Sequence, residues 1–333
     1  MKLSTRIAAI VGILGGAAAL VGVVSGRDTK PASTTRVLRV GYFPNVTHAQ
    51  GVIGAETSRE GRGWFEKRLG PGVKIQWFAY NAGPSAMEAL LAGSIDMTYV
   101  GPNPALNVYI RSAGDEVRVM SGAAEGGAAL VIHQDSRIAS AADFKGRRIG
   151  TPQLGNTQDV AARSWFKAHG LQVTLTGGDV QVIPTANPDQ LTLFSQGRLD
   201  GVWTVEPWVS RLVLESNGKV FLAQSDAVTT VLVAAVRALR EKPALVARFV
   251  EAHRELTEWI NAHPDEAREL VRTGLAAETR RAFSAALMAS AWSHLKFTDK
   301  VPVRRFETLV RDAQSVGFLR NAIPLDRLFS RRP

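Results

Sequence analysis

The chain has no cysteine among its 333 residues. This absence excludes disulfide bonds, zinc sites with cysteine ligands, thiol catalysis and a lipid-anchored N-terminal cysteine. Also missing are a Gly-x-Ser-x-Gly elbow, a phosphate-binding P-loop, a dinucleotide-binding glycine fingerprint and a His-Glu-x-x-His motif. The six histidines are scattered, and no two lie four residues apart as a helical metal site would need. We therefore expect no metal, no cofactor and no enzymatic activity, although a catalytic set assembled only in space stays open.

Long apolar runs are scarce, and the one that stands out begins the chain. Lys2 and Arg6 precede an uncharged run over 7–24, and the small residues Ser25 and Gly26 follow it. This order is typical of a secretory signal peptide, which we place at 1–26, with a polar linker at 27–35. An uncleaved N-terminal anchor is the alternative. Both interpretations place the remaining chain outside the cytoplasm, and we expect a periplasmic protein.

The chain carries a net charge of +10, but only 7% of its residues are aromatic. A basic excess can indicate a nucleic-acid partner. Stacking aromatics do not alternate with the basic residues here, and export also speaks against nucleic acid. We interpret the charge as a solvated surface and expect no nucleic-acid partner. With 45% hydrophobic residues, the chain is an ordinary globular protein long enough for two domains.

The body of the chain predicts an α/β fold. Strands and helices alternate with short links, which favours parallel strands joined by right-handed crossovers. A first series has expected strands at 37–42, 73–80, 95–100 and 117–123, and helices at 49–59, 64–69, 84–92 and 101–112.

After Glu125-Gly-Gly127 a second series begins. Its expected strands are 128–133, 147–151, 180–183 and 199–204, with a capped turn at 140–144 and helices at 157–169 and 188–196. A strand at 228–236 is expected to return to the first series. Helices at 243–263, 264–273, 278–290 and 303–316 would then pack against it. We predict lobe I from 36–126 and 231–333, and lobe II from 127–230.

The two series share one construction. Gly93-Ser-Ile-Asp96 and Gly197-Arg-Leu-Asp200 each end a helix and start a strand. The similarity is too short to establish a repeat by descent. We expect both aspartates to act in turn chemistry, not in catalysis.

Polar turns rich in glycine and proline follow the expected strands. Several of them begin helices, whose first N–H groups are unpaired and carry partial positive charge. Such turns, if they converge from two lobes, would form a cradle for a small anion without lysine. The turns are Asn45–His48, Asn81–Ser85, Gly101–Asn103, Glu125–Gly127, Gly155–Gln158 and Glu206–Trp208.

Several of these motifs resemble the sulfonate/nitrate/taurine family of ABC-transporter solute-binding proteins. They are Gly-Tyr-Phe-Pro-Asn-Val-Thr-His at 41–48, Asn-Ala-Gly-Pro-Ser at 81–85, Tyr-Val-Gly-Pro-Asn-Pro at 99–104, Gly-Gly-Ala-Ala-Leu-Val at 126–131 and Thr-Pro-Gln-Leu-Gly-Asn-Thr-Gln-Asp at 151–159. The resemblance covers about residues 36–320. It implies a type II periplasmic-binding-protein fold, with two α/β lobes, a two-strand hinge and a ligand cleft between them. It also implies cleft closure on a small anionic or zwitterionic ligand, and delivery to an ABC permease with its ATPase.

The resemblance places the polar turns in the cleft, and we expect the protein to be a monomer. Within the family, an aliphatic sulfonate such as taurine or an alkanesulfonate is the expected ligand. Glu206 could pair with the ammonium of a zwitterion, or it could be an outward-facing carboxylate at a helix start. The expected ligand-binding residues are Asn45, Thr47, His48, Gly83, Ser85, Asn103, Gly126, Asn156, Thr157, Gln158, Glu206 and Trp208.

Other interpretations stay open at this point. The ligand could be nitrate, bicarbonate, a phosphonate or a thiamine pyrimidine precursor. The chain could be a sensory module of the same fold, although an N-terminal signal stands where cytosolic regulators carry a helix-turn-helix. An enzyme of the related pyrimidine synthases is disfavoured because their cysteine-rich motif is absent.

Overall fold

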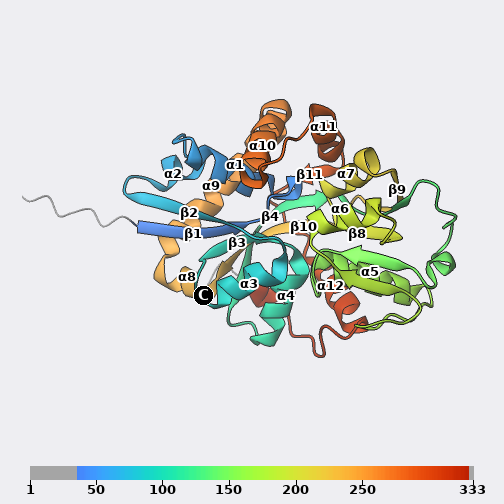
Figure 1. Ribbon diagram of the computed structural model, residues 1–333. Helices are drawn as coiled ribbons and strands as arrows, with labels where there is room; N and C mark the ends of the chain where they lie inside the picture. The colour runs from blue at the N-terminus through green and yellow to red at the C-terminus, as the bar shows by residue number, and fades with distance from the viewer. Residues whose placement is uncertain (1–35, 330–333) are drawn as a thin grey trace, which may run out of the picture. The chain divides into compact units, whose positions relative to one another are not determined.

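A computed structural model of the protein describes residues 36–329. The predicted signal peptide at 1–26 and linker at 27–35 lie outside the described residues. The described residues belong to one compact unit, and within it the strands form two separate sheets (Figure 1). The predicted α/β class is confirmed.

The first sheet has six strands in the order β11-β4-β10-β3-β1-β2. The strands β1, β2 and β3 are parallel, as predicted. The strand β4 has no neighbour from its own series, because β10 lies between β3 and β4 and is antiparallel to both. The chain enters β10 from the second sheet and so from the opposite direction, which makes the sheet mixed. The strands span Arg36–Tyr42 (β1), Val73–Ala79 (β2), Met97–Val100 (β3), Val117–Gly126 (β4), Val228–Ala235 (β10) and Leu295–Phe297 (β11).

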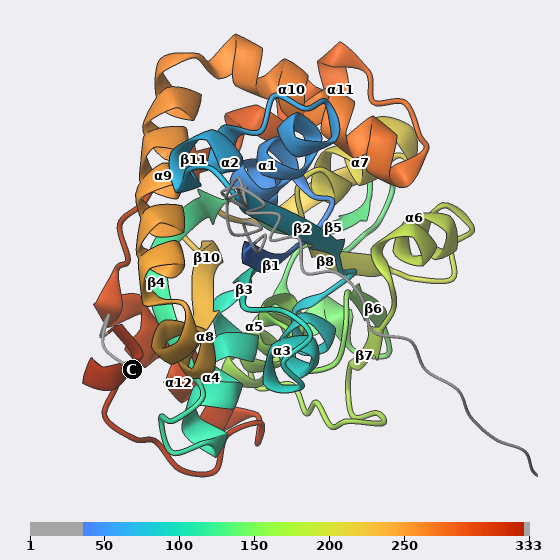
Figure 2. The same cartoon turned by 90° about the vertical axis from the view of Figure 1, so that its left-hand side faces the viewer.

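Helices cover both faces of this sheet and bury one large apolar core. Two groups lie on opposite sides of the strands, with α1, α2, α9 and α10 together and α3, α4 and α8 across from them (Figure 2). The helices span Ala49–Arg59 (α1), Trp64–Leu69 (α2), Gly83–Leu91 (α3), Pro102–Arg111 (α4), Val236–Glu241 (α8), Pro243–Ala262 (α9) and Pro264–Thr279 (α10).

The second sheet has five strands in the order β7-β6-β8-β5-β9. The strand β6 is parallel to β7 and β8, and β5 is antiparallel to β8 and β9. One face packs on α5 through Phe166, and the other packs on α6 and α7 through Phe194 and Leu212. The elements span Ala128–His133 (β5), Arg148–Thr151 (β6), Gln181–Pro184 (β7), Gly201–Val205 (β8), Gly218–Gln224 (β9), Thr157–Ala168 (α5), Asn187–Ser195 (α6) and Trp208–Glu215 (α7).

Two strand connections join the sheets, from β4 to β5 and from β9 to β10. They run side by side, since Gly126 N–H donates to Ala227 O at 2.8 Å. Gly126 and Gly127 have φ of 78° and 68°, a left-handed conformation that glycine adopts without strain. This pair of connections is the two-strand hinge of the fold. The lobe boundaries at 126/127 and 230/231 stay a prediction.

The C-terminal helices differ most from expectation. We expected helices at 264–273 and 278–290, but α10 continues to Thr279 and α11 spans Ala285–Ser293. Gly274 lies within α10 and does not end it. A Cβ at this position would lie 2.7 Å from Val52 of α1, so the glycine allows the two helices to pack closely. The last helix, α12 (Val303–Ser315), contacts both α4 and α5, so it does not pack on the first sheet alone. The remaining short 3₁₀ turns are Val46–His48 (η1), Ala141–Phe144 (η2) and Asp326–Phe329 (η3).

Candidate functional site

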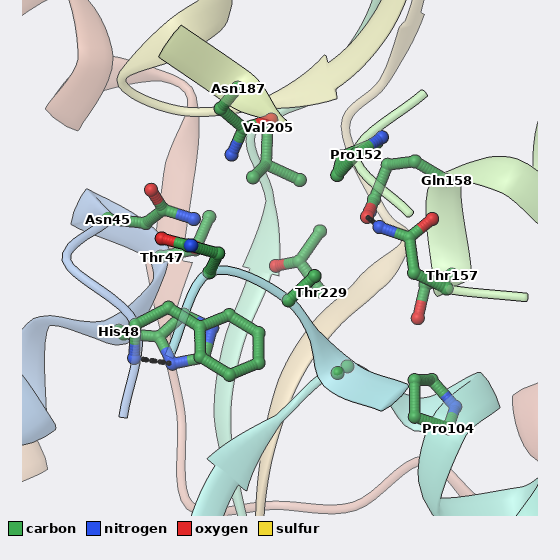
Figure 3. Close-up of a pocket in the computed structure, with 16 residues that line it drawn as sticks. Asn45, Thr47, His48, Pro104, Pro152, Thr157, Gln158, Asn187, Val205 and Thr229 are labelled. Atoms are coloured by element: carbon green, nitrogen blue, oxygen red, sulfur yellow. Dashed lines mark hydrogen bonds between the residues drawn. The ribbon is translucent and has the colours of Figure 1, made fainter. Parts of the chain in front are cut away.

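A cavity lies where loops of the two sheets meet (Figure 3). The loops after β1, β2 and β3 supply residues from the first sheet, and those after β6 and β7 supply residues from the second. All of these loops leave the carboxyl ends of parallel strands, the usual place of ligand sites in open α/β sheets. We call this space the inner cavity.

Seven of the twelve expected ligand-binding residues line the inner cavity. They come from both sheets, although they are up to 113 positions apart in the sequence. Figure 3 shows Thr157 and Gln158 opposite Asn45 and Thr47 across the cavity. The seven are Asn45, Thr47, His48, Gly83, Asn156, Thr157 and Gln158.

The starts of several helices converge on the inner cavity. The turn η1 and the helices α3, α4, α5 and α6 all have lining residues in or next to their first turn. The first N–H groups of a helix have no partner within the helix and carry partial positive charge. Their convergence favours an anion at this point.

Two glycines let these helix starts approach one another. A Cβ on Gly83 would lie 2.3 Å from Cγ of Pro104, and one on Gly101 would lie 2.5 Å from Oγ1 of Thr157. Neither distance is tolerable for a side chain. These glycines therefore allow α3 to pack on α4, and the loop before α4 to pack on the start of α5.

None of the described residues that line the inner cavity has a permanently charged side chain. The one titratable residue among them is His48, and burial lowers the pKa of its imidazole to about 3. Its Nδ1 accepts a hydrogen bond from Phe43 N–H at 3.3 Å (Figure 3). The neutral ring therefore carries its proton on Nε2, and it is a further uncharged donor.

The cavity is narrow. The centre of a water molecule can occupy about 20 Å³ of it, which is room for about one or two waters. Hydrogen bonds join loops and helices of the two sheets beside it, among them those from Trp208 Nε1 to Asn45 Oδ1 at 2.9 Å and from Ser85 Oγ to Gln153 Oε1 at 3.2 Å. The structure is thus a closed form of the cleft. Ser85 and Trp208 contribute to closure, and they do not line the cavity.

Glu206 is directed away from the inner cavity. It is fully buried and accepts hydrogen bonds from Ser210 N–H at 3.1 Å and from Ser210 Oγ at 2.9 Å. Nδ1 of His294 lies 2.7 Å from its carboxylate, and this hydrogen bond raises the pKa of His294. Glu206 is therefore neither a partner for a ligand ammonium in the cavity nor an outward-facing carboxylate at a helix start.

Two further expected residues lie elsewhere. Gly126 lies in the hinge, where a Cβ would be 2.5 Å from the carbonyl oxygen of His294. Asn103 does not line the inner cavity, although its N–H contacts Oγ1 of Thr157 at 3.4 Å. Its side chain borders a neighbouring groove.

The expected set did not include several residues that do line the cavity. Asn187 begins α6, and its Oδ1 accepts a hydrogen bond from Thr204 at 3.2 Å, which leaves its amide N–H₂ toward the cavity (Figure 3). The sequence signal was present, because Asn187 follows a strand and precedes Pro188 at a helix start. The other unexpected lining residues are Phe43, Asn81, Ala82, Gly101, Pro104, Pro152, Val205 and Thr229.

No helix within residues 36–329 is both long enough and apolar enough to cross a membrane. In the same part of the chain, no three histidine, aspartate or glutamate side chains cluster as metal ligands would.

This protein is similar to known proteins in both sequence and structure. A protein of Escherichia coli (strain K12), provisionally named as binding aliphatic sulfonates, is 28% identical over 216 residues. The match covers 62% of this chain and 62% of that relative's length. Among solved structures, the periplasmic aliphatic sulphonate binding protein SsuA from Escherichia coli has a TM-score of 0.66 at 20% identity, with 89% of this chain and 92% of that chain covered.

The periplasmic nitrate-binding protein NrtA from Synechocystis PCC 6803 has a TM-score of 0.68 at 13% identity, with 86% of this chain and 82% of that chain covered. At such identities the two structures show a shared fold, and they confirm the predicted periplasmic-binding-protein fold. The sequence pattern of the NMT1-like family matches residues 31–276, which is more than half of the chain. The protein belongs to the NMT1-like family.

Proposed function

We propose that this protein is the periplasmic binding component of an ABC importer, and that its ligand is a small organic anion. The observation that carries the proposal is the convergence of helix starts from both sheets on one cavity with an uncharged lining. Such a site attracts an anion through N–H groups and does not need lysine or arginine. The ligand enters when the cleft opens at the hinge, and closure then surrounds it.

The lining supports binding more than catalysis. A general acid or base works best when its pKa lies near the operating pH. His48 is the one titratable residue among the described lining residues, and its pKa of about 3 keeps it neutral. The described lining residues include donors that can hold an anion, and none of them is suited to shuttle a proton at neutral pH. A protein that binds its ligand without changing it can deliver that ligand to a membrane permease, and we expect this protein to do so as a monomer.

The electrostatics favour an alkanesulfonate. A sulfonate is a permanent monoanion whose three oxygens accept hydrogen bonds, so it suits neutral donors and needs no cation. Taurine also has an ammonium group, which would need a carboxylate close by. Glu206 is occupied by Ser210 and His294, so taurine is disfavoured. The provisional name of the Escherichia coli relative also supports a sulfonate. The solved nitrate-binding neighbour keeps nitrate as the second candidate.

A thermal-shift panel tests the proposal on the mature chain. It contains methanesulfonate, butanesulfonate, taurine, nitrate, bicarbonate, methylphosphonate and a thiamine pyrimidine precursor. A ligand at 100 times its Kd stabilises the folded state by about 2.7 kcal/mol. We expect the simple sulfonates to raise Tm more than taurine does. A shift with nitrate or the pyrimidine alone would refute the sulfonate assignment, and no shift with any anion would refute the anion site.

Thr157→Phe tests the location of the site. Thr157 lies at the first turn of α5 and is nearly buried in the lining, so a phenyl ring there would occupy the narrow cavity. We expect at least a tenfold loss of sulfonate affinity by isothermal titration calorimetry. Thr176→Phe, at an exposed position between α5 and β7, is the matched control and should bind normally. Unchanged affinity in Thr157→Phe would remove this turn from the site.

A further inference from the structure

A second hollow adjoins the inner cavity. It lies between α5, α12 and the segment from β9 to β10, and its volume is about 470 Å³. We call it the outer groove. Thr157, Gln158 and Thr229 line both spaces, so the groove and the proposed anion site share part of their walls.

Asn103 supplies the first sign that the groove receives a ligand. Its side chain is 4% exposed, and neither Oδ1 nor Nδ2 has a hydrogen-bond partner within residues 36–329. An unpaired buried amide is costly, and native proteins rarely leave both of its polar atoms unpaired. Both amide atoms are enclosed in this closed form. A polar ligand atom would pair with them by entering between Asn103 and Thr157, at the junction of the two spaces.

The chemistry of the groove differs from that of the inner cavity. Val160 and Trp165 of α5, Leu222 of β9 and Leu309 of α12 give it apolar walls. Such walls suit hydrocarbon, and they offer little to an inorganic anion.

Charged groups stand at the α12 side of the groove. Arg305 Nη2 is 3.3 Å from Asp226 Oδ2, and burial raises the pKa of Asp312. These groups belong to α12 and the hinge segment, whereas the residues shared with the inner cavity are uncharged.

We infer that the outer groove is a subsite for the carbon chain of an organic sulfonate whose head group occupies the inner cavity. This inference rests on the proposed function. It narrows the substrate class to sulfonates with a chain of several carbons or an aryl group. It also separates them from nitrate and bicarbonate, which have no part to place in the groove.

The affinity of the wild-type protein for a series of linear sulfonates tests the inference. Each methylene removed from water should tighten binding by about fourfold. Calorimetry with methanesulfonate, butanesulfonate and hexanesulfonate should therefore show Kd falling with chain length. If all three bind with equal affinity, the groove is not a subsite, although the proposed anion site stands. If none binds, the proposed function fails and the subsite with it.

A blocking variant tests where the carbon chain of the ligand lies. Ala161 is a partly buried residue of α5 that lines the groove and is absent from the inner cavity. Ala161→Phe should bring the affinity for hexanesulfonate down at least tenfold, toward that for methanesulfonate. Ala168→Phe, at an exposed position of the same helix, is the control and should keep the full dependence on chain length. Loss of that dependence in both variants, or in neither, would overturn the assignment.

Asn103→Leu provides a second test, because a purely structural role of Asn103 would not give the result expected from ligand binding. Leucine has a similar volume and no polar atoms to leave unpaired, so the variant should have a higher Tm than the wild type. Its affinity for butanesulfonate should fall at least fivefold, because the amide contact at the junction is lost. A lower Tm, or unchanged affinity, would contradict the assignment of Asn103 to ligand binding.

Discussion

Asp96 and Asp200 perform the same task in the two sheets. Each exchanges hydrogen bonds with an arginine of the neighbouring parallel strand: Asp96 N–H donates to Arg39 O at 2.8 Å, and Arg39 N–H donates to Asp96 Oδ2 at 2.9 Å. Asp200 repeats both contacts with Arg148, at 2.8 Å and 2.9 Å. The expected turn chemistry is thus a carboxylate that joins the start of one strand to the neighbouring parallel strand.

Replacing these aspartates should cost different amounts. Asp96 is fully buried, and although burial alone would raise its pKa, hydrogen bonds from Arg39 and Lys242 hold that pKa below its ordinary value. Asp96→Asn should lower the free energy of unfolding by about 2 kcal/mol or more, since bonds to charged partners are lost. Asp200 is 21% exposed, and Asp200→Asn should cost at most about 1 kcal/mol. Urea unfolding compares the two, and equal losses would contradict this account.

At the site, sequence predicts residues better than orientations. The turns at 45–48 and 156–158 could be identified because a strand end, a polar turn and a helix start follow one another in the sequence. Thr229 could not, because it lies within a β-branched run of β10 and reaches the cavity only through the crossing of the chain between sheets. The direction of Glu206 was equally hidden, since its partner His294 is 88 positions away.

Among the elements, those with clear ends were predictable. The bounds of α1 and α2 agree with expectation at both ends, because Gly61 to Gly63 and Gly70 to Gly72 interrupt the pattern. The helices α7 and α8 and the strands β9 and β11 were missed. The strand β11 has three residues, too few for an alternation to appear. Its place in the sheet depends on antiparallel pairing with β4, at a separation that local sequence does not reveal.

The start of α5 connects folding with binding at the scale of one element. Asn156 caps this helix, and its side-chain oxygen accepts a hydrogen bond from Asp159 N–H at 2.8 Å. Asn156→Ala removes the cap and should cost about 1 kcal/mol of stability. Asn156→Asp keeps an acceptor and places a negative charge at the positive end of the helix, so it should be nearly as stable as the wild type.

The two variants should differ more in their affinity for the ligand than in their stability. Asn156 lines the inner cavity, so the aspartate would repel an anion there. Calorimetry with butanesulfonate should show at least a tenfold loss of affinity for Asn156→Asp, and a smaller loss for Asn156→Ala. If the aspartate variant binds sulfonate as tightly as the wild type, the anion is not held at the start of α5.

For the molecule as a whole, two buried neutral histidines should govern stability in mild acid. Burial lowers the pKa of His48 to about 3 and that of His253 to about 4. His253 is held between Tyr99 OH at 3.0 Å and Gly122 O at 2.8 Å. Both side chains bind protons in the unfolded chain near pH 6.5 but stay neutral in the folded protein. Acidification therefore favours unfolding from about pH 6.5 downward, until the pH reaches their folded pKa values.

The slope of the free energy of unfolding against pH can be calculated and assigned to individual histidines. Below about pH 6, each such histidine should reduce the free energy of unfolding by about 1.4 kcal/mol per pH unit. His294 acts in a different range: its raised pKa adds stability below pH 6.5, and this stability is lost as the pH rises through the folded pKa. Because His48 and His253 contribute equally between pH 6 and 5, the free energy of unfolding of His253→Gln should fall with about half the wild-type slope in this range, as measured by urea unfolding. His263→Gln, at an exposed position, is the control. An unchanged slope in His253→Gln would mean that other groups take up the protons on unfolding.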